Sequence, residues 1–227
     1  RVRHHRELVP QIRAGRRSGE WPIPTDQFFS WGRMKKRGAP DDPEHAFFFI
    51  NATNALGIDG TSVRSLTEAE LVTRSQVEPL VRFLRKYAPG FEACYLDRTA
   101  AQAGVRETRR IVGEYTLTAE DVLEARHFAD GVVAGRNSID VHDEEGKLFE
   151  HRFLREGTHY EIPYRCFVPA GIEGLLVCGR CLSADRQALG SVRVMVVCMP
   201  MGEACGLAAA EAAKTGGGVR DVAPGAI

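Results

Sequence analysis

The stretch "VCGRCLSADRQALGSVRVMVVCMPMGEACGLAAAEAA", residues 177–213, decides how the rest of this 227-residue chain is interpreted. It begins inside an apolar run, residues 175–178, continues through a loop of small residues and ends in a segment rich in alanine and glycine. A continuous apolar run is typical of a strand covered on both faces, as in a parallel sheet. The stretch therefore predicts a strand over residues 175–178, then a loop, then a second apolar run, and then a helix that begins near Pro200.

Small residues gather at both ends of this predicted unit. Gly179 follows the strand, and four more lie near the expected helix start, namely Gly202, Ala204, Cys205 and Gly206. Glycine lets other groups approach the backbone closely, and a helix N-terminus offers free N–H groups and the positive end of the helix dipole. Such a unit could hold a flat, partly anionic ring system. The alternative, that the small residues only allow close helix–sheet packing, stays open.

Other helices are marked by capping patterns. Thr67 and Glu70 form a T-x-x-E pattern, which predicts a helix from Thr67 that Pro79 kinks and residues 88–90 end. Thr118 and Asp121 predict another helix that runs to about Ala134. The first 17 residues are rich in arginine and predict a short basic helix.

The remaining segments predict strands. "HAFFFIN", residues 45–51, has the composition of a buried strand, and "RETRRIVGEY", residues 106–115, alternates well enough to be one. Residues 137–169 predict strands around the turn "DEEG", and the glycines from Gly216 predict a linker or frayed end. Mixed strands and helices in this order indicate an α/β or α+β fold.

Composition narrows the classes of partner. Thirty lysines and arginines balance thirty acidic residues, which argues against nucleic acid or an anionic membrane as the main partner. No apolar run in the sequence reaches the ~18 residues that a membrane helix needs, so we expect no membrane-spanning helix. Six cysteines do not form a disulfide framework and suit reduced thiols, hence a cytoplasmic location. The chain could form a homo-oligomer.

Cys178 and Cys181 form a lone C-x-x-C pair. A zinc site of this type needs about four ligands, and a second pair at suitable spacing is not found, so we expect no metal site. A thiol redox or metal protein built on this pair is kept as a weak alternative. Packing of small residues is the simpler interpretation.

Three strings together carry a family resemblance. They are "GVRETRRIVGEYTLTAEDVLEARHFADGV" (104–132), "YEIPYRCFVPAGIEGLLVCGRCLSA" (160–184) and "GSVRVMVVCMPMGEACGLAAAEA" (190–212). In this order they resemble the C-terminal part of FAD-dependent oxidoreductases with the glutathione-reductase-type fold, and the likeness covers residues 47–213. The resemblance implies FAD as cofactor and hydride transfer between a small organic substrate and FAD.

The sequence departs from that family in one respect, since it contains no G-x-G-x-x-G string for the FAD pyrophosphate. The resemblance therefore implies a partial substrate domain over residues 1–164, the C-terminal part of an FAD-binding domain over 165–215, and a tail over 216–227. A non-catalytic binding or assembly module without cofactor, derived from such a substrate domain, remains the alternative.

The resemblance also implies site residues. Gly179, Arg180 and Ser183 match the loop along the ribityl chain and pyrophosphate, and Ser191 and Arg193 match the stretch that leads to the flavin. The small residues of the last helix, Gly202, Ala204, Cys205 and Gly206, match the helix start near the pyrimidine edge of the ring.

Arginines are the candidate catalytic residues. The planar guanidinium binds carboxylates with two hydrogen bonds, so Arg106 or Arg109 suits an anionic substrate. Arg165, in "IPYRC", comes just before the predicted flavin-facing strand and is expected, with Tyr164, to line the same cavity.

Overall fold

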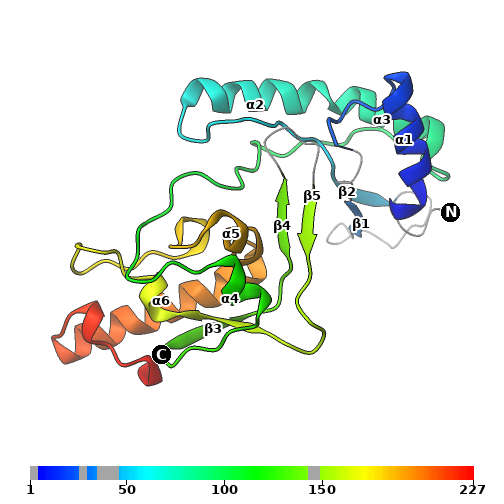
Figure 1. The fold of residues 1–227 in the computed structure, drawn as a ribbon. Coiled ribbons are helices and arrows are strands. Elements are labelled where there is room, and N and C mark those ends of the chain that lie inside the picture. Colours follow the sequence, from blue (N-terminus) through cyan, green and yellow to red (C-terminus); the bar gives the residue numbers. More distant parts are fainter. Residues whose placement is uncertain (1–4, 26–29, 35–45, 143–148) are drawn as a thin grey trace. The chain divides into compact units, whose positions relative to one another are not determined.

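The computed structural model describes residues 5–25, 30–34, 46–142 and 149–227. The chain forms two compact units, one of residues 1–104 with 144–147 and one of residues 105–143 with 148–227. Helices and small antiparallel two-stranded sheets make up the described residues (Figure 1), which confirms the mixed α/β class. The predicted division at residues 164 and 215 concerns function and stays a prediction.

The first unit combines helices with one hairpin. Its elements are the 3₁₀ turn η1 (His5–Leu8), the helix α1 (Val9–Ser18), the antiparallel strands β1 (Ser30–Met34) and β2 (Phe47–Asn51), and the helices α2 (Val63–Ser75) and α3 (Val77–Tyr87). The predicted basic helix and the "HAFFFIN" strand are thus present. Phe48 and Phe49 are exposed, however, so the prediction that this strand is buried is wrong.

Aromatic packing holds the core of this unit together. Trp21 meets Phe83 edge to face, with ring centroids 4.9 Å apart. Gly15 of α1 permits this approach, because a Cβ there would lie 2.6 Å from Cε2 of Phe83. Leu80 and Leu84 of α3 lie four residues apart on one helix face and are buried in the same core.

The predicted start of α2 at Thr67 is wrong. Ser62 is the N-cap, and its hydroxyl accepts a hydrogen bond from the Ser65 N–H. Thr67 lies inside the helix, where its hydroxyl donates to the Val63 carbonyl at 2.9 Å. α2 ends and α3 begins at Gln76. Pro79 lies in the first turn of α3, where the backbone N–H has no partner within the helix, so proline loses no helical hydrogen bond there.

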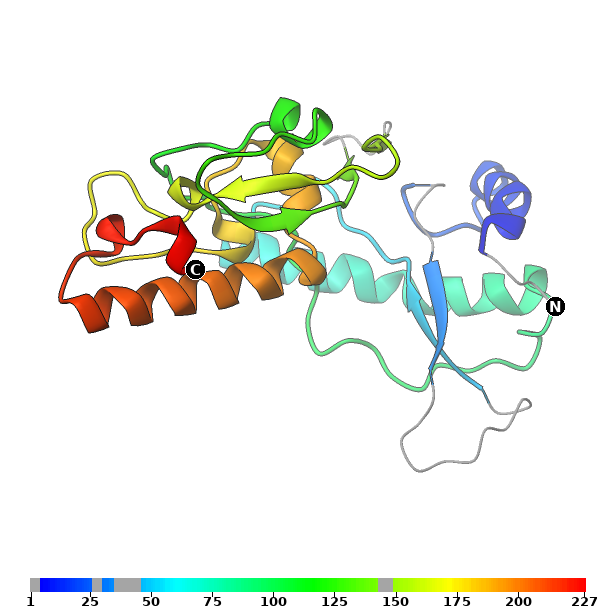
Figure 2. The ribbon, with the colours of Figure 1, turned by 90° about the horizontal axis from the view of Figure 1, so that it is seen from below.

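The second unit holds the longest helix. Its elements are α4 (Ala119–Leu123), β3 (Gly131–Gly135), β4 (Ile139–His142), β5 (Phe149–Arg152), β6 (Tyr160–Pro163), η2 (Tyr164–Cys166), η3 (Gly179–Cys181), α5 (Arg186–Val192), α6 (Met195–Thr215), η4 (Val219–Asp221) and η5 (Pro224–Ala226). β3 pairs with β6 and β4 with β5, both antiparallel. Figure 2 shows α6 running along the β3–β6 sheet. The strands predicted around "DEEG" are present, and the turn itself lies outside the described residues.

The Thr118 cap is confirmed, but the length of its helix is not. Thr118 and Asp121 form a reciprocal capping box at the start of α4. The helix ends at Leu123, and Ala125 adopts a left-handed φ of 52°. A continuation to Ala134 is wrong because residues 131–135 pair with β6 instead.

Two predicted strands are wrong. Residues 106–115 and 175–178 belong to no strand, because neither pairs with a described segment beyond an isolated antiparallel bridge between Gly113 and Pro169. The segment from residue 106 instead runs extended and bonds at single points, such as Ile111 N to Cys181 O at 2.9 Å and Leu117 N to Ser183 O at 3.1 Å. Leu117 and Ala184 form one isolated parallel bridge.

Helix α6 begins at Met195, so the predicted start near Pro200 is wrong. The earlier start is explained by a row of buried side chains along one face of α6, which we call the stripe. These side chains recur at helical spacing on both sides of Pro200 and pack into the core. The stripe consists of Val197, Met201, Ala204, Ala208 and Ala212. Among the described residues, α6 is also the one helix long and apolar enough to cross a membrane, by length and composition alone. About a quarter of this apolar window, 28%, is buried inside the second unit.

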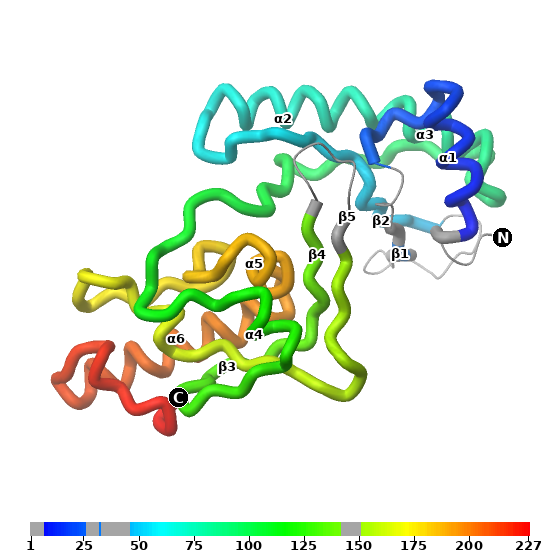
Figure 3. Tube along the Cα trace, viewed as in Figure 1, coloured from blue at the N-terminus to red at the C-terminus, as the bar shows by residue number. Residues whose placement is uncertain are grey.

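The C-terminal tail is packed rather than frayed, which corrects the prediction for residues after Gly216. Val219 and Val222 are buried in the core of the second unit. The Tyr164 hydroxyl donates to the Val219 carbonyl at 2.8 Å. Figure 3 shows the tail turning back beside α6.

Candidate functional site

The junction between α5 and α6 brings several predicted site residues together. Arg193 ends α5, and Val194 is the N-cap of α6. α5 rests directly on β4, because a Cβ at Gly190 would lie 2.9 Å from the Asp140 carbonyl oxygen. Glycine at this position therefore sets Arg193 beside β4.

Arg193 and Arg106 meet at one residue of β4. Nη2 of Arg193 donates to the Asp140 carbonyl at 2.9 Å, and Nη1 donates to the Arg106 carbonyl at 3.4 Å. Nη2 of Arg106 forms an ion pair with Asp140 Oδ2 at 3.0 Å. Burial, and then the nearby charge of Arg106, lower the pKa of Arg193 to about 10.

Among the described residues, further arginines and a second carboxylate lie close to this contact. The Glu107 carboxylate pairs with Arg110 and with Arg186, each at 3.4 Å. Oδ1 of Asp140 is buried and accepts no hydrogen bond from a described residue. We call the group of four arginines and two carboxylates the arginine cluster; it consists of Arg106, Arg110, Arg186, Arg193, Glu107 and Asp140.

The N-terminus of α6 opens beside this cluster. The first helical hydrogen bonds are donated by Val197 and Cys198 to the Val194 carbonyl, at 3.0 and 2.9 Å. The N–H groups before them have no partner within the helix. Met195, Val196 and Met199 surround them and are 81%, 63% and 67% exposed. The N–H groups that lack a partner within the helix thus belong to a segment with exposed apolar side chains.

The small residues predicted at the helix start lie further along α6. Gly202 and Gly206 are exposed in its second and third turns, and a Cβ built on either one meets no atom within 4 Å apart from the adjacent residues and the local helix backbone. Ala204 faces the core. Because these residues follow the first turn, the free N–H groups are not theirs, and the dipole argument applies to residues 194–196 instead.

The loop predicted along the ribityl chain is built around Gly179. This residue has a φ of 76°, and its N–H contacts the Met201 sulfur at 3.4 Å. Arg180 is exposed and donates to the Val105 carbonyl at 2.7 Å.

The two predicted serines lie inside the protein. The Ser183 hydroxyl is buried and lies 3.1 Å from Oγ1 of Thr116. Ser191 Oγ is bonded to Tyr160 Oη at 2.8 Å and donates to the Asn137 carbonyl. Both hydroxyls therefore hold the scaffold, and direct contact with a cofactor stays a prediction.

Thiols line the inner side of α6. Cys205 is half-buried, and its thiol is within hydrogen-bonding reach of Cys178. Burial, and then Cys178, raise the pKa of Cys205 to about 12. A thiol with such a pKa stays protonated at neutral pH, which does not favour a redox dithiol at this position.

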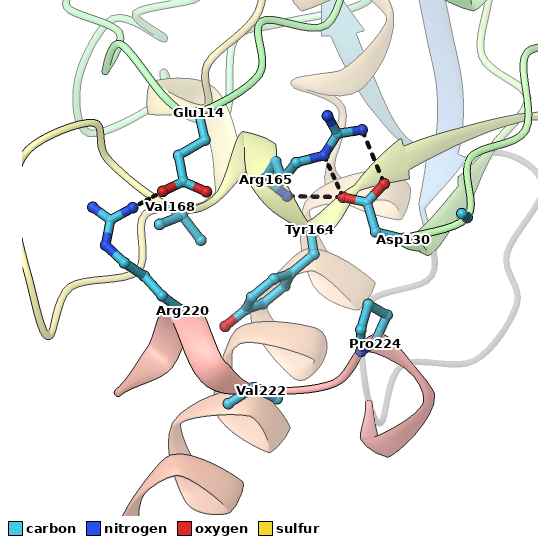
Figure 4. Close-up of a pocket in the computed structure, with 9 residues that line it drawn as sticks. Glu114, Asp130, Tyr164, Arg165, Val168, Arg220, Val222 and Pro224 are labelled. Atoms are coloured by element: carbon cyan, nitrogen blue, oxygen red, sulfur yellow. Dashed lines mark hydrogen bonds and ion pairs between the residues drawn. The ribbon is translucent and has the colours of Figure 1, made fainter. Parts of the chain in front are cut away.

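Arg165 lies elsewhere in the second unit, at a pocket of about 390 Å³ (Figure 4). Its Nε and Nη2 bind the Asp130 carboxylate at 2.8 and 3.1 Å, and its guanidinium lies 5.0 Å from the Tyr115 ring centre. Across the pocket Arg220 pairs with Glu114. No member of the arginine cluster lines this pocket, so the structure does not bring Arg165 and Arg106 together.

Arg109 is exposed and forms no ion pair with a described residue.

Sequence reasoning missed Asp140, which binds both Arg106 and Arg193. The alternation of "IDVH" places Asp140 opposite Ile139 and Val141, but nothing in that pattern distinguishes it from an ordinary exposed acid.

No curated protein and no solved structure matches this chain at a significant level. The sequence profile of the family described as FAD dependent oxidoreductase does match, over residues 6–227. This match confirms the resemblance noted from residues 47–213 and extends it toward both ends. The chain therefore belongs to the family of FAD-dependent oxidoreductases.

Proposed function

We propose that this chain takes part in hydride transfer between a small organic substrate and FAD, and that the α5–α6 junction forms part of the flavin site. The observation that carries the proposal is the N-terminus of α6. Its free N–H groups open into the exposed apolar surface of Met195, Val196 and Met199, beside the arginine cluster.

This surface fits a flat ring with an apolar body and a polar edge. Met195 and Met199 offer apolar contact, while the N–H groups and the helix dipole favour negative charge on the polar edge. FAD, when bound, supplies the hydride acceptor. The exposed backbone at Gly202 and Gly206 leaves room for another group to lie against the same helix.

The arginines have different roles in this proposal. Arg193 fixes the start of α6 through its two carbonyl partners and adds positive charge below the helix N-terminus. Arg106 is partly exposed and Arg109 is exposed, so they are the candidates for binding a substrate carboxylate. The charge of Arg165 is matched by Asp130, and we assign it to the pocket of Figure 4 rather than to an anionic substrate.

A pair of substitutions at Met195 tests the proposal. Met195→Pro removes one N–H at the first helical position, and the preceding Val194 has an extended ψ of 148° that accepts a following proline. Met195→Ala removes the same side chain but keeps the N–H. In fluorescence titrations with FAD, we expect the proline variant to bind about tenfold more weakly than the alanine variant.

Two outcomes would contradict the proposal. The full chain could show no uptake of FAD and no flavin absorption bands, which favours the non-catalytic module. Alternatively, the two Met195 variants could bind FAD equally well, which would remove the helix N-terminus from the site. Circular dichroism of both variants checks that α6 has formed.

The same proposal includes a cytoplasmic location and small-molecule rather than nucleic-acid or membrane partners. All six cysteines are free, which suits a reducing compartment. Charge is balanced over the sequence, with 30 basic and 30 acidic residues. Cell fractionation tests the location, and light scattering tests whether copies of the chain associate.

A further inference from the structure

A second group of functional side chains lies outside the proposed flavin site. His127, His159 and Glu161 each present one ligand atom, and these atoms lie within 4.8 Å of one another. Nδ1 of His127 is 3.1 Å from Oε1 of Glu161. The rings of His127 and His159 pack edge to face with centroids 4.6 Å apart.

The fold brings these residues together from separate segments. His159 comes directly before β6 and Glu161 lies within it, while Tyr160 and Ile162, on either side of Glu161, are fully buried. The Glu161 N–H donates to the Arg126 carbonyl at 3.0 Å, which holds the loop of His127 against the strand. Because the two histidines are far apart in sequence, no short histidine motif reveals the group.

The carboxylate of Glu161 is fixed before any ligand binds. Its Oε2 accepts a hydrogen bond from the Phe128 N–H at 2.9 Å. Gly131 on the paired strand makes room for it, because a Cβ there would lie 2.8 Å from the Glu161 carboxyl carbon. Oε2 is thus held by the backbone, and Oε1 is directed toward His127.

We propose that His127, His159 and Glu161 form a binding site for a divalent transition-metal ion, of which Zn²⁺ is the best fit. Imidazole and carboxylate ligands suit this ion. Tetrahedral zinc with bonds of about 2.0 Å places its ligand atoms about 3.3 Å apart. The observed separations, 3.1 Å for one pair and at most 4.8 Å for all, require only small side-chain rotations.

The site is accessible from solvent. The His127 side chain is 57% exposed, so an ion can enter without opening the core. Three protein ligands leave the fourth position of a tetrahedral ion for water or for an exogenous ligand. The site is independent of the flavin proposal, because it uses none of the residues at the α5–α6 junction.

The test is a Zn²⁺ titration of the full chain, freed of metal with a chelator, in competition with a chromophoric chelator. We expect one equivalent to bind, and at least tenfold weaker binding by His127→Ala and by His159→Ala. His151→Ala is the matched control, since His151 is an exposed histidine of the same unit, on β5, and lies outside the cluster. It should bind as the wild-type chain does.

Cobalt distinguishes this site from the cysteines. Co²⁺ bound to nitrogen and oxygen shows visible bands without the near-ultraviolet charge-transfer band that thiolate ligands give. Binding that survives His159→Ala but is lost in Cys178→Ser would overturn the proposal, and so would a wild-type chain that binds no Zn²⁺. Should an alanine variant unfold, His159→Gln serves in its place, and a thermal melt identifies which variants are folded.

Discussion

The guanidinium of Arg193 donates to the main-chain carbonyl of Asp140 at 2.9 Å, across the contact between the α5–α6 junction and β4. The same Asp140 receives Arg106 on its carboxylate. One strand residue therefore contacts both the start of α6 and Arg106, whose side chain is partly exposed. Structure and proposed function depend on the same contact.

Replacing Arg193 by lysine should destabilise this junction. The ammonium group of lysine has no planar fork and cannot reach the carbonyls of Asp140 and Arg106 together. We expect the free energy of unfolding to fall by about 1.5–3 kcal/mol in urea denaturation, the range for hydrogen bonds to charged groups. Arg109→Lys is the control and should stay within about 0.5 kcal/mol of wild type, because Arg109 is exposed. Equal losses in both variants would refute the assigned role of Arg193.

Two glycines should respond to alanine in opposite directions. Gly202 lies in an exposed helix interior with free space around it, so Gly202→Ala should raise the free energy of unfolding by about 0.5–1 kcal/mol. Gly135 faces the buried Tyr160 ring, and a Cβ there would lie 2.6 Å from Cε2. Gly135→Ala should lower stability by about 1–3 kcal/mol.

The Gly202 variant also tests its predicted place in the cofactor site. If FAD or another group lies against the helix there, Gly202→Ala should weaken FAD binding while it stabilises the chain without cofactor. A variant that is more stable and binds FAD as wild type does would remove Gly202 from the site. Thermal melts with and without FAD measure both quantities in one experiment.

Asp121 should be among the most sensitive residues of the second unit. Its carboxylate is fully buried and accepts hydrogen bonds from the Tyr115 hydroxyl, the Thr118 N–H and the Arg126 guanidinium. Asp121→Ala removes the acceptor of the Tyr115 hydroxyl and of the Thr118 N–H, while Arg126 keeps Glu124 as a partner at 2.9 Å. We expect a loss of about 2–4 kcal/mol in urea denaturation, the cost of two buried donors left without an acceptor. Thr118→Ala removes only the other half of the capping box and should cost about 0.5–2 kcal/mol. Equal costs would contradict the central role of the carboxylate.

Capping patterns show how far sequence alone could predict this fold. Thr118 and Asp121 form the predicted box, whereas Thr67 and Glu70 have the same spacing and do not cap. Ser62, five residues earlier, is the N-cap instead. Thr67 therefore lies inside the helix, and its hydroxyl donates to the Val63 carbonyl. Local spacing identifies a possible cap, but tertiary packing decides which one is used.

The candidate site could be predicted only in part for a similar reason. The family strings indicated Arg106 and Arg193, and the structure joins them. Their common partner Asp140 follows from the pairing of β4 with α5, which no local pattern encodes. The start of α6 was misplaced because Pro200 and the glycines after it resemble a helix start, while the buried stripe extends back to Val197.

The buried thiol of Cys166 predicts a loss of stability at alkaline pH. Burial raises its pKa from 9.0 to about 12 in the folded chain. Above pH 9 the unfolded chain therefore releases a proton that the folded chain keeps, so the free energy of unfolding falls as pH rises toward 12. The expected slope from this single group is about 1.4 kcal/mol per pH unit.

Comparison with Cys166→Ala isolates this contribution from those of other groups. Arg193, whose folded-state pKa is lowered to about 10, acts in the opposite direction above that pH, and it does so equally in both proteins. Urea denaturation at several pH values between about 8.5 and 10.5 should thus give a shallower pH dependence for the variant, even if its stability at neutral pH is lower. Parallel curves for the two proteins would contradict the prediction, because they would mean that the Cys166 thiol ionises as readily in the folded chain as in the unfolded one despite its burial in the core of the second unit.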